Sequence, residues 1–110
     1  MAVNNPSSMP SSNVPAGFTK CNNSSISLKS NTPVMVFEQN KDRAYAVIIN
    51  NSSAQVTLVF TDTAQTSIGK GITLNPFGGN LEINQTNLYL GRINAICAVD
   101  SSLSFVECTN

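Results

Sequence analysis

Apolar and polar residues alternate along most of this chain, and turn-forming residues interrupt the alternation at intervals of about 8–12 residues. The stretch 43–60 shows the pattern most clearly. Residues 46–49 form a short apolar run, and residues 56–60 alternate around Val56, Leu58 and Phe60. Between them, residues 50–54 favour a chain reversal, because Asn tolerates positive φ and Asn and Ser side chains bond to nearby backbone. We therefore expect a central β-hairpin over 43–60, with one strand buried on both faces.

Short segments with the same alternation lie on both sides of this hairpin. Strands are expected near 25–29, at a sheet edge, and at 34–37, 72–74, 81–83, 92–99 and 103–107, whereas no segment has the helical period. The sequence thus predicts an all-β protein, a single-domain β-sandwich of about eight short antiparallel strands with a jelly-roll-like arrangement. The residues expected mainly in its core are Val47, Ile49, Val56, Leu58, Phe60, Ile93, Ala95, Phe105 and Val106.

Length and charge narrow the possible functions. A chain of 110 residues fits one domain, and six basic residues balance six acidic ones. This neutrality gives no electrostatic attraction for nucleic acid or for an anionic membrane. The chain has no histidine, which excludes histidine-based acid–base catalysis and most zinc sites. We expect no catalytic residue, no metal and no cofactor.

The chain has three cysteines, Cys21, Cys97 and Cys108. Because their number is odd and no CxxC motif is present, we interpret them as small buried apolar residues in a reducing compartment. One disulfide bond with one free thiol is the alternative that the sequence leaves open.

The first sixteen residues differ in composition from the rest. Residues 1–16 are rich in Asn and Ser and contain three prolines, so they lack the apolar surface that folding requires. They also lack the basic start and apolar segment of a secretory signal. We predict a flexible arm over 1–16 followed by a β-sandwich domain over 17–110. The arm is either a disordered tail or a segment that binds a neighbouring subunit, and its candidate partner-contact residues are Val3, Met9, Val14 and Phe18.

Residues 40–107 carry a series of strand and turn motifs with a recognisable order. They are Asn40-x-x-Arg43, Val47-x-Ile49-x-Asn51-x-Ser53, Val56-x-Leu58-x-Phe60 with Ala64, Gly71-Ile72-x-Leu74-x-Pro76-Phe77-Gly78-Gly79, Gly91-x-Ile93-x-Ala95-Ile96-x-Ala98 and Leu103-x-x-Val106-Glu107. This order resembles the small all-β virion proteins of tailed bacteriophages. Phe77 departs from their pattern, because it is an extra residue between the proline and the glycine pair.

The resemblance implies a structural protein of a phage particle. It would be a capsid decoration (cement) protein that binds the major capsid protein, sits on the exterior of the virion, forms a dimer or trimer and is made in the host cytoplasm. The alternative is a receptor- or carbohydrate-binding module of a tail or fibre, although the chain has no Trp and only two Tyr to act as sugar platforms. An enzyme is the third possibility, because glycoside hydrolysis needs only two carboxylates, which Asp62, Glu82, Asp100 and Glu107 could supply.

Overall fold

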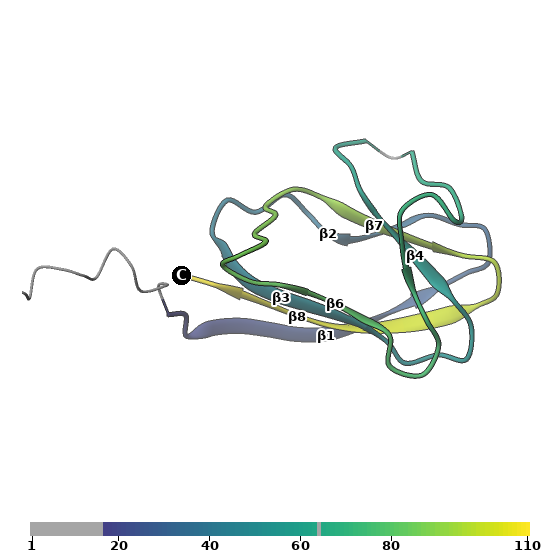
Figure 1. Ribbon diagram of the computed structural model, residues 1–110, viewed down its shortest axis with the longest axis horizontal. Helices are drawn as coiled ribbons and strands as arrows, with labels where there is room; N and C mark the ends of the chain where they lie inside the picture. Colours follow the sequence, from purple (N-terminus) through teal and green to yellow (C-terminus); the bar gives the residue numbers. More distant parts are fainter. Residues whose placement is uncertain (1–16, 64) are drawn as a thin grey trace, which may run out of the picture.

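The computed structural model describes residues 17–63 and 65–110, which form two β-sheets packed face to face (Figure 1). The strands are β1 (Lys20–Leu28), β2 (Val34–Phe37), β3 (Arg43–Asn50), β4 (Val56–Phe60), β5 (Ile72–Leu74), β6 (Asn80–Ile83), β7 (Ile93–Cys97) and β8 (Ser101–Thr109). No helix in the described ranges is long and apolar enough to cross a membrane.

Each sheet contains four antiparallel strands. Sheet A has the order β1-β8-β3-β6, and sheet B has the order β2-β7-β4-β5. Each of the first four strands pairs with one of the last four: β1 with β8, β2 with β7, β3 with β6 and β4 with β5. This pairing is that of one long antiparallel hairpin rolled into two sheets, which is a jelly roll. The expectation of an all-β, jelly-roll-like sandwich with eight strands is therefore confirmed.

The predicted hairpin over 43–60 is wrong. β3 pairs with β6 and β8 in sheet A, whereas β4 pairs with β5 and β7 in sheet B. The turn at 51–55 thus carries the chain from one sheet to the other. The Asn and Ser residues of this turn indicate a change of direction, but they do not specify which strands pair on either side of it.

The direction in which β3 faces also differs from the prediction. Its buried residues include Ala46 and Ile48, whereas Val47 and Ile49 lie half-buried on the outer face of sheet A. Successive residues of this run are all apolar, so no alternation of polar and apolar residues marks its inner face. The sequence therefore could not show which residues of β3 point inward.

The remaining core predictions have mixed outcomes. Val56, Leu58, Ile93 and Ala95 are buried in the core, and Phe105 packs against it from a partly buried position. Val106 is half-buried and pairs with Val47 across the outer face of sheet A. Phe60, the last residue of β4, is 40% exposed, and its ring stacks on Tyr89 with 4.2 Å between the ring centres.

Two neighbouring strands of sheet B have buried residues on both faces, and one of them, β4, belongs to the predicted hairpin. Thr57 on β4 and Asn94 on β7 point away from the core, yet both are buried beneath described residues of the loop after β4. The Gly69 N–H donates to Thr57 Oγ1 at 3.0 Å, and Asn94 Nδ2 donates to the Thr63 carbonyl at 3.2 Å. The polar side chains under the loop are thus satisfied by the loop itself.

A disulfide bond joins Cys21 on β1 to Cys108 on β8, and Cys97 is free and buried in the core. The expectation of three buried free cysteines is therefore wrong, and the alternative of one bridge and one thiol describes the protein. Cys21 and Cys108 are separated by 87 residues in sequence but face each other in the β1–β8 register. No local sequence pattern indicates such a pairing.

Candidate functional site

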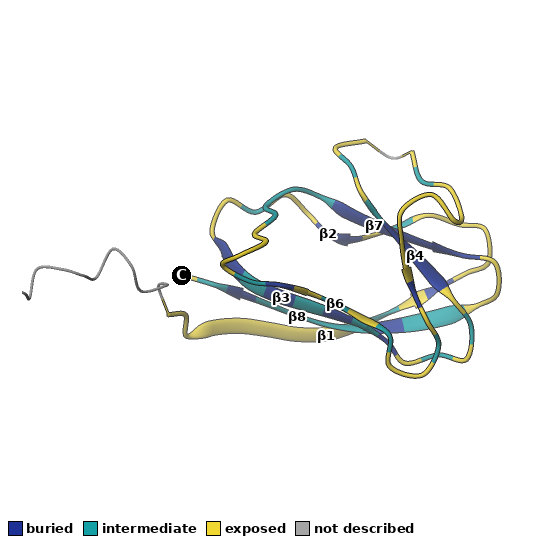
Figure 2. Cartoon of the chain, in the orientation of Figure 1, coloured by how far each residue is buried: buried dark blue, intermediate teal, exposed yellow. Residues whose placement is uncertain are grey.

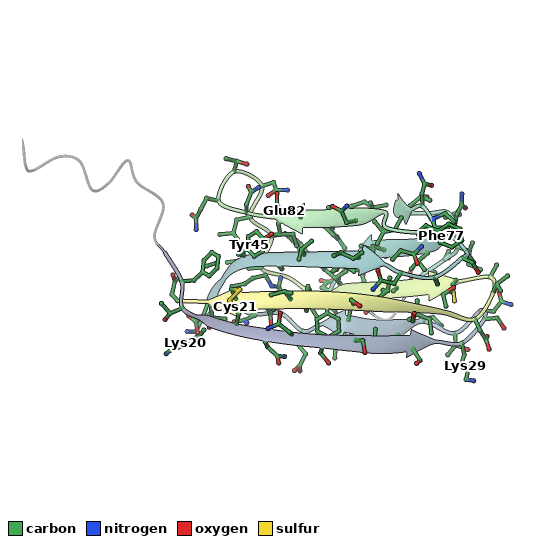
Figure 3. All side chains as sticks on the ribbon, turned by 90° about the horizontal axis from the view of Figure 1, so that it is seen from below. Lys20, Cys21, Lys29, Tyr45, Phe77 and Glu82 are labelled. Atoms are coloured by element: carbon green, nitrogen blue, oxygen red, sulfur yellow. A yellow bond between two sulfur atoms is a disulfide. The ribbon has the colours of Figure 1, made fainter. Side chains whose placement is uncertain are left out.

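The most exposed large apolar side chain in the described residues belongs to Phe77, in the turn between β5 and β6. It is 79% exposed, and its φ of 60° lies in the left-handed region, which is unfavourable for a bulky residue without glycine's freedom. Figure 3 shows it at the end of the sandwich opposite Tyr45. The aromatic ring of Phe77 is thus held in solvent by a backbone conformation that phenylalanine disfavours.

The backbone of this turn is fixed by hydrogen bonds to the β3–β4 turn. The Phe77 N–H donates to the Ser52 carbonyl at 3.0 Å, and the Gly78 N–H donates to the Asn50 carbonyl at 2.8 Å. Gly79 lies so close to the backbone of Asn75 that a Cβ atom at this position would collide with it. The glycine pair therefore permits the tight path that places Phe77 at the tip.

The buried side chain of Asn50 holds the two turns together. Its Nδ2 donates to the carbonyls of Ala54, Leu74 and Asn75 at 2.8, 3.1 and 3.2 Å, and its Oδ1 accepts from the Ser52 N–H at 3.0 Å. A buried amide with this many partners fixes its surroundings, because both its NH₂ group and its oxygen bond to residues of the two turns. The Phe77 turn is thus preorganised.

The shape of this site determines what it can do. Three clefts on the described surface, of about 250, 320 and 340 Å³, are lined by residues other than Phe77, whose ring is largely exposed. A small-molecule site is normally concave, whereas a rigid projecting aromatic residue can enter an apolar pocket on a partner protein. The arrangement offers contact area and no reactive group.

Phe18 is the one residue of the predicted partner-contact arm that the structure describes; Val3, Met9 and Val14 lie outside the described residues. Its ring stacks on Tyr45 of its own domain, with 5.5 Å between the centres and 17° between the planes. Tyr45 donates a hydrogen bond from its hydroxyl to Glu82 Oε2 at 2.8 Å. The chain thus enters the domain on the outer face of sheet A, at the end where Figure 3 places Tyr45 and Glu82.

The pKa of Tyr45 is raised above its ordinary value of 10.0. The main cause is the hydrogen bond to Glu82, which requires the phenol to keep its proton. Partial burial and the negative charge of Glu82 act in the same direction. Tyr45 is therefore a neutral hydrogen-bond donor rather than a reactive phenolate.

The four carboxylates considered for an enzyme lie on different parts of the fold. Glu82 binds Tyr45, Asp100 accepts from the Ser30 N–H at 2.8 Å, and Glu107 binds Arg43 at 2.8 Å. Asp62 is exposed in the loop after β4. The described interactions therefore assign a structural partner to three of the four and join none of them to another.

One of these carboxylates, Glu107, lines a cleft of about 340 Å³ together with Glu38, which is not among the four. The lining is largely polar and includes Asn22 and Gln39. The Glu107 oxygen facing Arg43 is already bound, so this cleft offers a hydrogen-bonding surface rather than a free acid–base pair. In the described part of the chain, no three Cys, Asp or Glu residues gather in a way that could hold a metal ion.

Phe77 was not predicted as a functional candidate from the sequence, where it stands out only as an insertion before the glycine pair. The available signal was an aromatic residue directly before a Gly-Gly pair in a turn, where small or polar residues are usual. In comparisons with protein-family models, curated proteins and solved structures, none matches this chain.

Proposed function

We propose that this protein is a structural component of a tailed-phage particle, a capsid decoration (cement) protein that binds the major capsid protein and stabilises the shell. The observation that carries the proposal is the exposed, preorganised ring of Phe77. Aromatic residues of this kind contribute most of the binding free energy at many protein interfaces, because little conformational entropy is lost when they dock.

Three further features support this function. The motifs of residues 40–107 resemble those of small phage virion proteins, and jelly rolls are common in capsid proteins. The Cys21–Cys108 bond fits the exterior of a virion, since disulfides persist where the surroundings are oxidising. Many copies on one shell would stabilise it through multivalency, without strong binding by any single copy.

The alternative function is that of a carbohydrate-binding module on a tail or fibre, and it requires a different surface. Sugars bind in concave or flat sites with an aromatic platform and several converging polar groups. Phe77 projects from the surface, and the Phe60 and Tyr89 rings stack on each other. These features favour a protein partner.

A particle-binding experiment tests the proposal. Recombinant protein is added to phage particles that lack it, and the bound copies are counted after sedimentation. Phe77→Ala should weaken binding about tenfold or more while leaving the melting temperature unchanged. Leu88→Ala is the matched control, because Leu88 is also an exposed apolar residue but lies in the 84–92 loop. Wild-type protein that does not bind shells, or that binds tails instead, would overturn the proposal.

A second variant tests the predicted arm. Deleting residues 2–15 keeps Phe18 and its stacking on Tyr45. The deletion should leave the melting temperature nearly unchanged and lower the number of copies retained on the particle. If the truncated protein is retained as well as the wild type, residues 1–16 have no part in attachment, and the Phe77 result alone decides the proposal.

A further inference from the structure

The two sheets have four edge strands, and one of them differs from the others. β6 and β2 have four residues each and β5 has three, and the pairing of β2 is irregular. β1 has nine residues and pairs with β8 over its whole length without a bulge. Short or irregular edges prevent unwanted strand pairing, so β1 is the one edge in the described fold that is open to another strand.

The register of β1 shows which of its backbone groups are free. The Cα atoms of Cys21 and Cys108 are 4.0 Å apart, which identifies a pair that exchanges no backbone hydrogen bonds. Because the pattern alternates, the N–H and C=O groups of Cys21, Asn23, Ser25 and Ser27 point away from β8. Within the described ranges no other strand pairs with this edge.

The side chains of β1 leave this edge accessible. Residues 20–25 are all exposed, so little burial holds this part of the strand in place, as Figure 2 shows. The strand contains no proline, and charged residues stand only at its start, Lys20, and just after its end, Lys29 (Figure 3). The disulfide bond to β8 fixes this exposed strand. The result is a rigid template for strand addition whose one charged residue is its first.

We infer that β1 pairs antiparallel with β1 of a second copy of this chain, about a two-fold axis at Ser24. Ser24 is the central residue of Lys20–Leu28, so this register overlaps all nine residues. It places Asn23 opposite Ser25 of the partner copy, as a pair that exchanges backbone hydrogen bonds. Sheet A then continues across both copies. The inference does not depend on the proposed function.

The chemistry of the strand favours a second copy over other occupants. In this register Lys20 lies opposite Leu28 of the partner copy, so no like charges face each other. Next to the axis, Ser24 meets Ser24 and Asn23 meets Ser25 of the partner copy, so small uncharged side chains face each other. A two-fold interface of this sort uses one surface patch twice. The segment 1–16 is a poorer occupant, because its three prolines lack the N–H groups that pairing requires.

Sedimentation equilibrium tests whether this edge forms the dimer. The wild-type protein should have about twice the mass of the 11.7 kDa chain. Ser25→Pro removes an outward N–H without affecting the bonds to β8, and the two-fold axis doubles the loss. It should raise the dissociation constant of the dimer about tenfold or more. Ser25→Ala keeps the N–H and should dimerise like the wild type. A monomeric wild type, or equal dimerisation of both variants, would overturn the inference.

Cross-linking tests the register. Ser24→Cys places two thiols opposite each other at the axis and should give a covalent dimer on mild oxidation. Asn22→Cys is the control, because it lies on the same side of the strand but opposite Ile26 of the partner copy. Equal cross-linking of both variants would exclude this register. A β1 edge that becomes protected from amide exchange only when capsid particles are added would show that the occupant is a different protein.

Discussion

The guanidinium of Arg43 is fully buried, and its Nε lies 2.8 Å from Oε2 of Glu107. Its other nitrogens donate to three backbone carbonyls, those of Glu38, Tyr89 and Gly91, at 2.8, 2.8 and 3.1 Å. A buried charge is tolerated when it is paired and hydrogen-bonded, and four of the five N–H groups of Arg43 donate to these acceptors. It thereby connects the first strand residue of β3 to β8 and to two loops that have no regular structure of their own.

We expect Arg43→Ala to lower the free energy of unfolding by about 3–5 kcal/mol, because it leaves the Glu107 carboxylate and three carbonyls without their partner. Glu107→Gln should cost less, since Arg43 keeps its three carbonyl bonds. Lys41→Ala is the control: Lys41 pairs with Asp42 at an exposed site and should change stability by less than about 0.5 kcal/mol. Urea unfolding measures all three. Equal effects for Arg43→Ala and Lys41→Ala would show that the network contributes nothing.

Reduction of the Cys21–Cys108 bond should also lower stability. The bond closes a loop over a sequence separation of 87 residues, for which the chain-entropy model gives about 4–5 kcal/mol. Thermal unfolding with and without a thiol reductant measures the effect. Cys97→Ala should keep this sensitivity to reductant, because Cys97 forms no bond to either cysteine. A melting temperature that does not respond to reductant would mean that the bond does not form or does not stabilise the fold.

The sequence predicted the fold class because strand periodicity and turn composition are local properties. It gave the wrong partner for β3 because pairing depends on contacts with β6 and β8, which lie more than thirty residues away. The disulfide was missed for the same reason. The facing of β3 was missed because Val47, Ile48 and Ile49 are all apolar, so only the packing of the two sheets decides which of them points inward.

The facing of β3 leads to a direct test. Ile48→Ala should lower the free energy of unfolding by about 2–5 kcal/mol, because Ile48 is fully buried in the core. Ile49→Ala removes the same atoms from the half-buried outer face and should cost clearly less. Denaturant midpoints of the two variants give the comparison. If Ile49→Ala is the more damaging change, β3 faces the other way, as the sequence pattern first suggested.

The candidate contact sites could be predicted only in part. Phe18 was identified from its spacing among the apolar residues near the N-terminus, but its stacking on Tyr45 could not be foreseen, because it depends on the fold. β1 was predicted only over 25–29, since the Asn and Ser residues of its first half have weak strand preference. The disulfide and the pairing with β8 override that preference. The turn that carries Phe77 is held by the Asn50 hydrogen bonds, which connect residues some 25 positions apart.

The ionisation of the Tyr45 phenol can be used to test its hydrogen bond to Glu82 on the outer face of sheet A. Tyr89→Phe leaves Tyr45 as the one tyrosine of the chain, so tyrosinate absorbance reports its pKa directly. The pKa should lie above 10.0 and fall toward that value when Glu82→Gln is added. Because folding raises this pKa, the protonated phenol stabilises the folded state below about pH 10, and that stabilisation is lost as the pH rises through the folded-state pKa. An unchanged pKa after Glu82→Gln would mean that Glu82 is not its cause.

Phe77 allows stability and binding to be separated. Phe77→Asn should raise the free energy of unfolding by about 0.5–1 kcal/mol, because Asn tolerates the left-handed φ of 60° and the exposed ring has little packing to lose. Gly78→Ala should act in the opposite direction, since a Cβ is strained at its φ of 113°. Thermal unfolding measures both. A more stable Phe77→Asn variant that no longer binds particles would show that the aromatic residue serves contact with a partner and not the fold. A less stable variant would show that the Phe77 ring packs within its own domain and is not available for display.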